Sequence, residues 1–183
     1  IGGANPNTAY DFSRVADDNL VTTLTFTTTG TLHATTATNW GSVDNVVVSG
    51  STLTLTGAQA SNKNIDGADN GSIVVSLDDT ADWDFSRITV EGTGTFSAQV
   101  NQDVELAADS NLGNLAVAVD ANRTLTLTAE QAAGRTITGA GHVTVTDLDE
   151  TPGADLSGIS VTGTRKVEVD ANVTFTGNFG TFR

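Results

Sequence analysis

Thr124-Leu125-Thr126-Leu127-Thr128 repeats, residue for residue, the stretch Thr52-Leu53-Thr54-Leu55-Thr56, which lies 72 positions earlier in the chain. The same offset places Gln131-Ala132 on Gln59-Ala60. Self-similarity at a fixed offset is the signature of a repeat architecture. We therefore interpret the chain as copies of a unit of about 72 residues.

The match continues beyond these strand-like stretches. After a one-residue adjustment, Asp155-Leu156-Ser157 falls on Asp84-Phe85-Ser86, and Asp11-Phe12-Ser13 is an earlier copy of the same text. The sequence thus predicts one domain, residues 1–183, built from a partial repeat (11–51), a full repeat (52–123) and an incomplete repeat (124–183).

Apolar and polar residues alternate within each repeat. Leu53 and Leu55 point one way, while the threonines between them point the other way, as in a half-buried strand. Such segments recur every ~8–12 residues between Gly, Asn, Asp and Ser clusters. Stretch 129–133 is at most one helical turn. The predicted fold class is all-β.

The predicted architecture is a parallel, right-handed β-solenoid. The aromatic residues are few, with 7 Phe, 2 Trp and 1 Tyr, and the inward residues are mostly small, which suits a thin core between stacked coils. The competing architecture is a pair of β-sandwich domains, whose cores would contain more aromatic residues. In the solenoid, we expect 52–56 and 124–128 to be equivalent strands on one continuous sheet.

Charge excludes two classes of partner. The chain has 22 acidic and 8 basic residues, a net charge of −14. Nucleic acid and anionic membrane surfaces both require clustered Lys and Arg, so we expect binding to neither. No apolar run reaches the ~18 residues needed to span a bilayer, so we also expect no membrane insertion. The acidic surface is explained by solubility, or alternatively by turns that bind Ca²⁺.

The sequence also bears on location. Cys is absent, which does not argue against export, because stacked coils supply a core without disulfides. The first residue is Ile1, so we expect a mature secreted product or a segment of a larger surface protein. The predicted location is extracellular, at the cell surface.

The segment from Leu125 to Leu148 resembles the repeats of very large bacterial surface and secreted proteins. These proteins are filamentous-haemagglutinin-like adhesins or fibre proteins. The likeness covers most of residues 45–176 and is one of repeat style. It implies an extracellular structural or adhesive role and does not name a ligand. A glycan or a cell-surface receptor is the class of partner that we expect beside a second copy of the chain. It provides no catalytic residues to transfer.

We expect no enzymatic activity, and no catalytic or cofactor-binding residue is assigned. The histidines, His33 and His142, are isolated in Thr-rich strands and give neither a catalytic triad nor a zinc signature. The alternative is a glycan-binding or glycan-cleaving β-helix, because paired carboxylates occur at 78–84 and at 147–155. Their presence in both copies favours turn architecture instead.

Two further hypotheses concern the acidic turns and the threonines. Asp78, Asp79 and Asp82 are candidate calcium ligands in a non-standard turn, since 66–71 fails as an EF-hand loop. Ranks of Thr-x-Thr could instead order water as in ice-binding solenoids, although the motif recurs in the sequence only about every third coil.

Self-assembly end to end is the last prediction. Terminal coils expose backbone hydrogen-bonding groups and an open apolar cross-section, and no amphipathic capping helix is evident. We expect strand addition between copies to give a homo-oligomer or filament. The candidate contact residues are Ile1, Phe175, Phe179 and Phe182.

Overall fold

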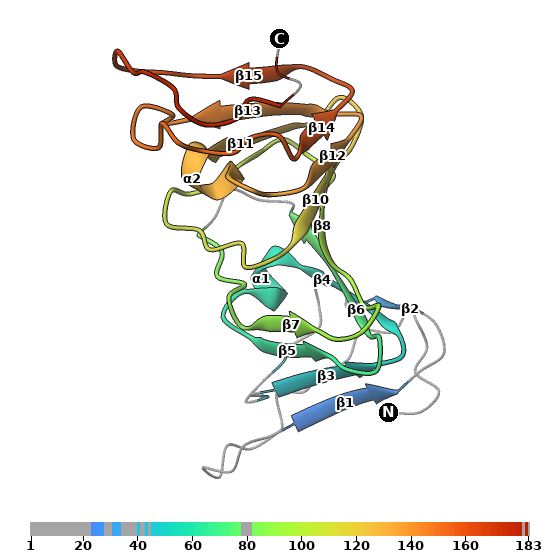
Figure 1. Cartoon of the computed structure of the whole chain (residues 1–183). Coiled ribbons are helices and arrows are strands. Elements are labelled where there is room, and N and C mark those ends of the chain that lie inside the picture. The colour runs from blue at the N-terminus through green and yellow to red at the C-terminus, as the bar shows by residue number, and fades with distance from the viewer. Residues whose placement is uncertain are drawn as a thin grey trace. The chain divides into compact units, whose positions relative to one another are not determined.

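The computed structural model is all-β, and its parallel strands form a β-solenoid, as predicted (Figure 1). It describes residues 23–27, 31–33, 40, 43, 45–77, 82–180 and 182. Two compact units are present. The first comprises Ile1–Ser76 and Asp84–Ser97, and the second Leu77–Trp83 and Ala98–Arg183.

The first unit contains two parallel sheets and a one-turn helix. One sheet has the order β1-β3-β5-β7, and the other contains β2, β4 and β6 in the pairing β2-β4-β6. The elements are β1 (Thr23–Thr27), β2 (Thr31–His33), β3 (Asn45–Ser49), β4 (Thr52–Thr56), α1 (Gly57–Ala60), β5 (Asn64–Gly67), β6 (Ser72–Leu77) and β7 (Ile88–Val90). Strand β8 (Phe96–Val100) then leads into the second unit.

The second unit has the same plan. One sheet has the order β9-β11-β13-β15, and β10, β12 and β14 pair in the other (Figure 1). The elements are β9 (Val104–Glu105), β10 (Ala116–Val119), β11 (Thr124–Thr128), α2 (Ala129–Ala132), β12 (Ile137–Gly139), β13 (His142–Thr146), β14 (Ile159–Val161) and β15 (Arg165–Val167).

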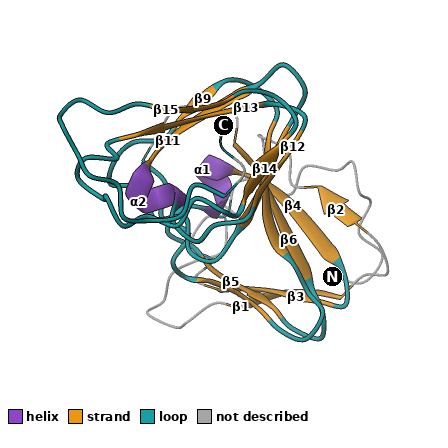
Figure 2. Ribbon diagram, turned by 45° about the horizontal axis from the view of Figure 1, so that its top comes forward, coloured by secondary structure: helices purple, strands orange, loops and turns teal. Residues whose placement is uncertain are grey.

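Aliphatic residues of one coil stack on aliphatic residues of the next coil. Leu125 pairs with Val143 in one unit, and Ile65 pairs with Ile88 in the other. The inward residues of β4, Leu53 and Leu55, are buried, and its threonines are half-buried on the outer face. The alternation in the sequence therefore reports the sheet faces correctly. In Figure 2, which is coloured by secondary structure, the strands are orange and the helical turns α1 and α2 are purple.

Glycines at the coil corners permit this close stacking. A Cβ on Gly71 would lie 1.8 Å from the carbonyl oxygen of Val48, and a Cβ on Gly163 would lie 2.1 Å from the carbonyl oxygen of Gly141. Real Cβ atoms do not approach backbone oxygens this closely. These turns therefore need glycine for space between neighbouring coils.

The repeat in the sequence corresponds to a repeat of strands and helical turns in the structure. One prediction that was drawn from it is corrected here. The repeat offset maps β3, β4, α1 and β5 onto β10, β11, α2 and β12. However, β4 pairs with β2 and β6, whereas β11 pairs with β9 and β13, in a different sheet. The prediction that the two Thr-Leu-Thr-Leu-Thr strands share one continuous sheet was wrong. The reason is that β9 opens a new sheet after β8, and β11 joins it.

Candidate functional site

The helical turn α2 positions a glutamine that links two coils. Thr128 caps the helix: its hydroxyl accepts a bond from the Gln131 backbone N–H (3.2 Å), and its own N–H donates to Gln131 Oε1 (3.0 Å). The amide nitrogen of Gln131 donates to the carbonyl oxygens of Ala107 (2.7 Å), Ala108 (3.2 Å) and Ser110 (3.3 Å). Gln131 is buried, with 8% exposure, and both the nitrogen and the oxygen of its side-chain amide are hydrogen-bonded.

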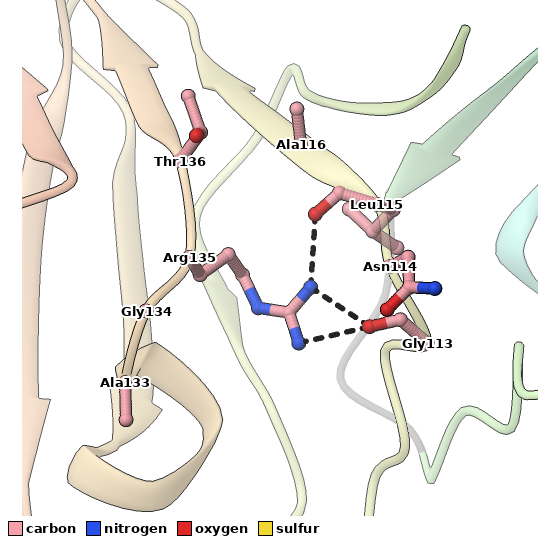
Figure 3. Close-up of a pocket in the computed structure, with 8 residues that line it drawn as sticks. All are labelled: Gly113, Asn114, Leu115, Ala116, Ala133, Gly134, Arg135 and Thr136. Atoms are coloured by element: carbon pink, nitrogen blue, oxygen red, sulfur yellow. Dashed lines mark hydrogen bonds between the residues drawn. The ribbon is translucent and has the colours of Figure 1, made fainter. Parts of the chain in front are cut away.

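Arg135 continues this arrangement just after the helical turn. Its Nε donates to the carbonyl oxygen of Gln131 (2.9 Å), and Nη1 donates to those of Leu115 (2.8 Å) and Gly113 (3.3 Å). Its Nη2 also donates to Gly113 (3.2 Å), as Figure 3 shows. The guanidinium thus joins coil segment 133–136 to segment 113–116.

Two hollows open beside this side chain. The first, of about 240 Å³, is lined by Gly113, Asn114, Leu115, Ala116, Ala133, Gly134, Arg135 and Thr136. The second, of about 430 Å³, is lined by Ala108, Asp109, Ser110, Asn111, Leu112, Glu130, Gln131 and Arg135. Burial lowers the pKa of Arg135, because a charged group loses hydration there, but arginine stays protonated.

The full repeat (52–123), called the first repeat from here on, contains a simpler version of the same link. Thr56 and Gln59 form an equivalent capping box at α1. Lys63, which lies 72 positions before Arg135, reaches the carbonyl oxygen of Val43 at 3.5 Å. The position therefore carries a coil-bridging cation in both repeats.

Asx turns recur along the coils. An Oδ1 atom accepts the backbone N–H of the second residue after it at about 3.0 Å, in Asp84, Asn111, Asp155 and Asn178. Hydrogen bonds from Ser86 lower the pKa of Asp84, with a smaller contribution from Arg87, and those from Ser157 lower the pKa of Asp155. These carboxylates serve the turns that they occupy.

In three of these four turns, the residue after the Asx points into the core. Phe85, Leu112 and Leu156 are all buried there. Phe179, the next residue of this series, is 36% exposed. The series explains why Asp-Phe-Ser and Asp-Leu-Ser recur in the sequence: the acid shapes the turn and the apolar residue anchors it.

The calcium site predicted from Asp78, Asp79 and Asp82 stays a prediction. Asp78 and Asp79 lie outside the described residues, and Asp82 is exposed. Within the part of the chain that the structure describes, no group of three or more His, Asp or Glu side chains lies close enough to hold a metal ion. In the second acidic stretch, Asp147 accepts a bond from the Thr146 hydroxyl (2.9 Å), and Asp155 forms its Asx turn.

The histidines occupy strand positions. His33 is exposed on β2. His142 begins β13, and its Nδ1 accepts a hydrogen bond from the backbone N–H of Thr164 (2.9 Å). In the first repeat, the Ser72 hydroxyl begins β6 and accepts the backbone N–H of Thr95 (3.0 Å) in the same way. The ring nitrogen therefore acts as a link between coils.

Three of the predicted self-assembly residues lie together. Phe175 stacks on Phe179 with ring centroids 3.8 Å apart, and Phe179 lies 6.2 Å from Phe182. The Arg165 guanidinium lies 5.8 Å from the centre of the Phe182 ring, within cation–π range. Ile1 lies outside the described residues. Assembly between copies stays a prediction.

The threonine array covers adjacent coils. Thr126 pairs with Thr144, and Thr128 pairs with Thr146, so two Thr-x-Thr motifs lie in register rather than three coils apart. Glu105 and Lys166 flank the Thr126–Thr144 column on the neighbouring strands. Charge thus interrupts the array on both sides.

Sequence reasoning missed Gln131 and Arg135 as linking residues. The signal was present, since Gln59 and Lys63 precede them by the repeat offset. A buried amide and a cation at matching positions indicate a structural need in both copies. Their carbonyl partners, however, come from a neighbouring coil and are not adjacent in the sequence.

Comparison with protein-family models, curated proteins and solved structures finds no match to this chain. Among the described residues, no helix is long and apolar enough to cross a membrane.

Proposed function

We propose that this chain is a non-enzymatic structural segment of an extracellular bacterial fibre, adhesin or surface layer. The observation that carries the proposal is the use of its polar side chains. Gln131, Arg135 and His142 all donate to, or accept from, backbone groups of another coil. Groups that elsewhere bind substrates are used here to hold coils together.

The repetition of these links supports the same conclusion. Lys63 takes the place of Arg135 in the first repeat, and Ser72 takes the place of His142. An enzyme site is unique within a domain, whereas a scaffold needs its links in each repeat. The parallel ladder and buried aliphatic core then give a stiff element that presents its polar outer face.

Self-association belongs to this proposal. Phe179 is 36% exposed and stacks on Phe175, so an apolar surface is available to another β-coil. A second copy of the chain is the partner that we propose, by stacking of coils along the solenoid axis. The acidic surface restricts less specific contacts through mutual repulsion.

The proposal is tested by electron microscopy and by activity measurements on the purified chain. Filamentous assemblies of the chain, and no release of reducing ends from neutral or acidic polysaccharides, are expected. Turnover of polygalacturonate that is lost in Asp82→Ala, but kept in the control Asp109→Ala, would overturn it. Asp109 is a suitable control because it is also exposed and lies in a turn.

A further inference from the structure

Arg135 is a half-buried cation whose partners are all backbone carbonyls. The ion pair found among the described residues joins Lys166 and Glu168, so Arg135 forms no salt bridge with a carboxylate of this part of the chain. Burial is the cause of its lowered pKa, with no contribution from a neighbouring charge. In a chain of net charge −14, this guanidinium has no directly bonded counter-charge among the described residues.

Its hydrogen-bonding capacity is not exhausted. A guanidinium has five N–H donors. The Nε–H is used by Gln131, both hydrogens of Nη1 by Gly113 and Leu115, and one hydrogen of Nη2 by Gly113. The second hydrogen of Nη2 has no partner among the described residues, so one charged donor is available.

Arg135 lines an open hollow of about 240 Å³. Thr136 is exposed and also lines this hollow, and Figure 3 shows the Arg135 guanidinium extending from the segment that carries Gly134 toward Gly113 and Leu115. A Cβ built on Gly134 would meet no atom within 4 Å, so that side of the hollow is not filled by protein. A group of a few heavy atoms can therefore reach Arg135.

We propose that this hollow binds a carboxylate group, carried by a small organic acid or by a uronic acid residue of a glycan. A carboxylate oxygen accepts the available N–H in a charge-assisted bond. As a monoanion, it neutralises the guanidinium without adding excess negative charge to an acidic chain. The Thr136 hydroxyl provides a second donor or acceptor for a sugar hydroxyl.

The link between coils and the ligand site are compatible. In the first repeat, Lys63 reaches one carbonyl oxygen, that of Val43, and serves the link alone. Arginine at the second position makes the same link and still presents a free N–H. This inference goes beyond the scaffold function and does not depend on it.

The test uses the whole chain, with backbone amide shifts followed by NMR during titration with acetate, galacturonate and galactose. Saturable shifts of the amides of Gly113, Gly134 and Thr136 are expected with the two carboxylates, with a dissociation constant on the order of 1 mM. Equal shifts with the neutral sugar galactose, or none with either carboxylate, would overturn the proposal. Acetate alone would identify a small acid, and tighter binding of galacturonate would identify a glycan; both results support a carboxylate site.

Variants separate the site from general effects. Arg135→Met should abolish the shifts, whereas the exposed control Arg123→Met should keep them. Thr136→Glu and Thr136→Gln form a matched pair that leaves the links of Arg135 in place. The Glu variant supplies a carboxylate from the chain and should weaken binding at least tenfold, while the Gln variant should retain it. Unchanged binding in Thr136→Glu contradicts the site, even where Arg135→Met does not fold.

Discussion

The Nδ1 atom of His142 accepts a hydrogen bond of 2.9 Å from the backbone N–H of Thr164, on the following coil. An accepting Nδ1 requires the ring proton on Nε2. The Ser72 hydroxyl accepts the N–H of Thr95 at the matching place in the first repeat. Two side chains with catalytic potential in other proteins thus perform one structural task here.

A glycine at a coil corner should be irreplaceable where the neighbouring coil is close. In Gly163→Ala the new Cβ would lie 2.1 Å from the carbonyl oxygen of Gly141, so the coils must separate. We expect the free energy of unfolding to fall by about 1–3 kcal/mol. The matched control is Gly153→Ala, whose Cβ would lie 3.8 Å from Thr176 Oγ1 and should change stability by less than about 0.5 kcal/mol. Equal effects in urea unfolding would contradict this account of the corners.

The Asx turns predict a pH dependence of stability. Hydrogen bonds from Ser86 and Ser157 depress the folded-state pKa of Asp84 and Asp155 below the ordinary value of 3.8. The ionised forms are therefore favoured by folding. Their contribution is fully present above the unfolded-state pKa and is lost as the pH falls through the folded-state values.

Asn at both positions retains the Oδ1 acceptor and removes the titration. The double variant Asp84→Asn, Asp155→Asn should lose less stability than the parent between pH 5 and about pH 2, measured by urea unfolding. The exposed Asp109 provides the control variant, Asp109→Asn, which should follow the parent. A double variant as acid-sensitive as the parent would remove the Asx turns from the explanation.

Gln131 should be far more sensitive to substitution than its helical neighbour. Gln131→Ala removes one half of the capping box and the side-chain donor to the carbonyl oxygens of Ala107 and Ala108. Because the helix cap and several part-buried hydrogen bonds are lost together, we expect the free energy of unfolding to fall by about 1–3 kcal/mol in thermal or urea unfolding. Glu130→Ala, exposed on the same turn, should stay within about 0.5 kcal/mol of the parent.

The aromatic cluster predicts concentration-dependent assembly. Phe179→Ser removes the exposed ring that stacks on Phe175, and the mass measured by light scattering should then stay at one chain across a concentration series in which the parent grows. Val169→Ser is the control, since Val169 is 44% exposed and belongs to no ring contact of the cluster. A parent chain that remains monomeric throughout would leave self-association unsupported.

The fold followed from features that act locally. Alternation in Thr52–Thr56 and Thr124–Thr128 reports a strand with one buried face, and the offset between them reports a repeated coil unit. Sheet membership did not follow, because it depends on which coil each strand meets. The short strand β9 decides that β11 joins a different sheet from the one that contains β4, and its sequence carries no such signal.

The linking residues were less accessible from the sequence for a related reason. Clustered carboxylates in the sequence suggest a catalytic site. In the structure, however, Asp84 and Asp155 accept hydrogen bonds from Ser86 and Ser157 in their own turns. Arg135 is isolated in the sequence, and its carbonyl partners become neighbours only when one coil stacks on another. Such pairs of donor and carbonyl acceptor can be identified only when it is known which coil segments stack on each other.

The central claim, that polar side chains hold one coil to another, is tested most directly at Arg135 by urea unfolding. Arg135→Met removes the donors to Gly113, Leu115 and Gln131, and should lower the free energy of unfolding by about 2 kcal/mol, with Arg135→Lys in between. Lys166→Met, at an exposed ion pair, should change it by less than about 0.5 kcal/mol. Equal stability of Arg135→Met, Lys166→Met and the parent chain would contradict the claim.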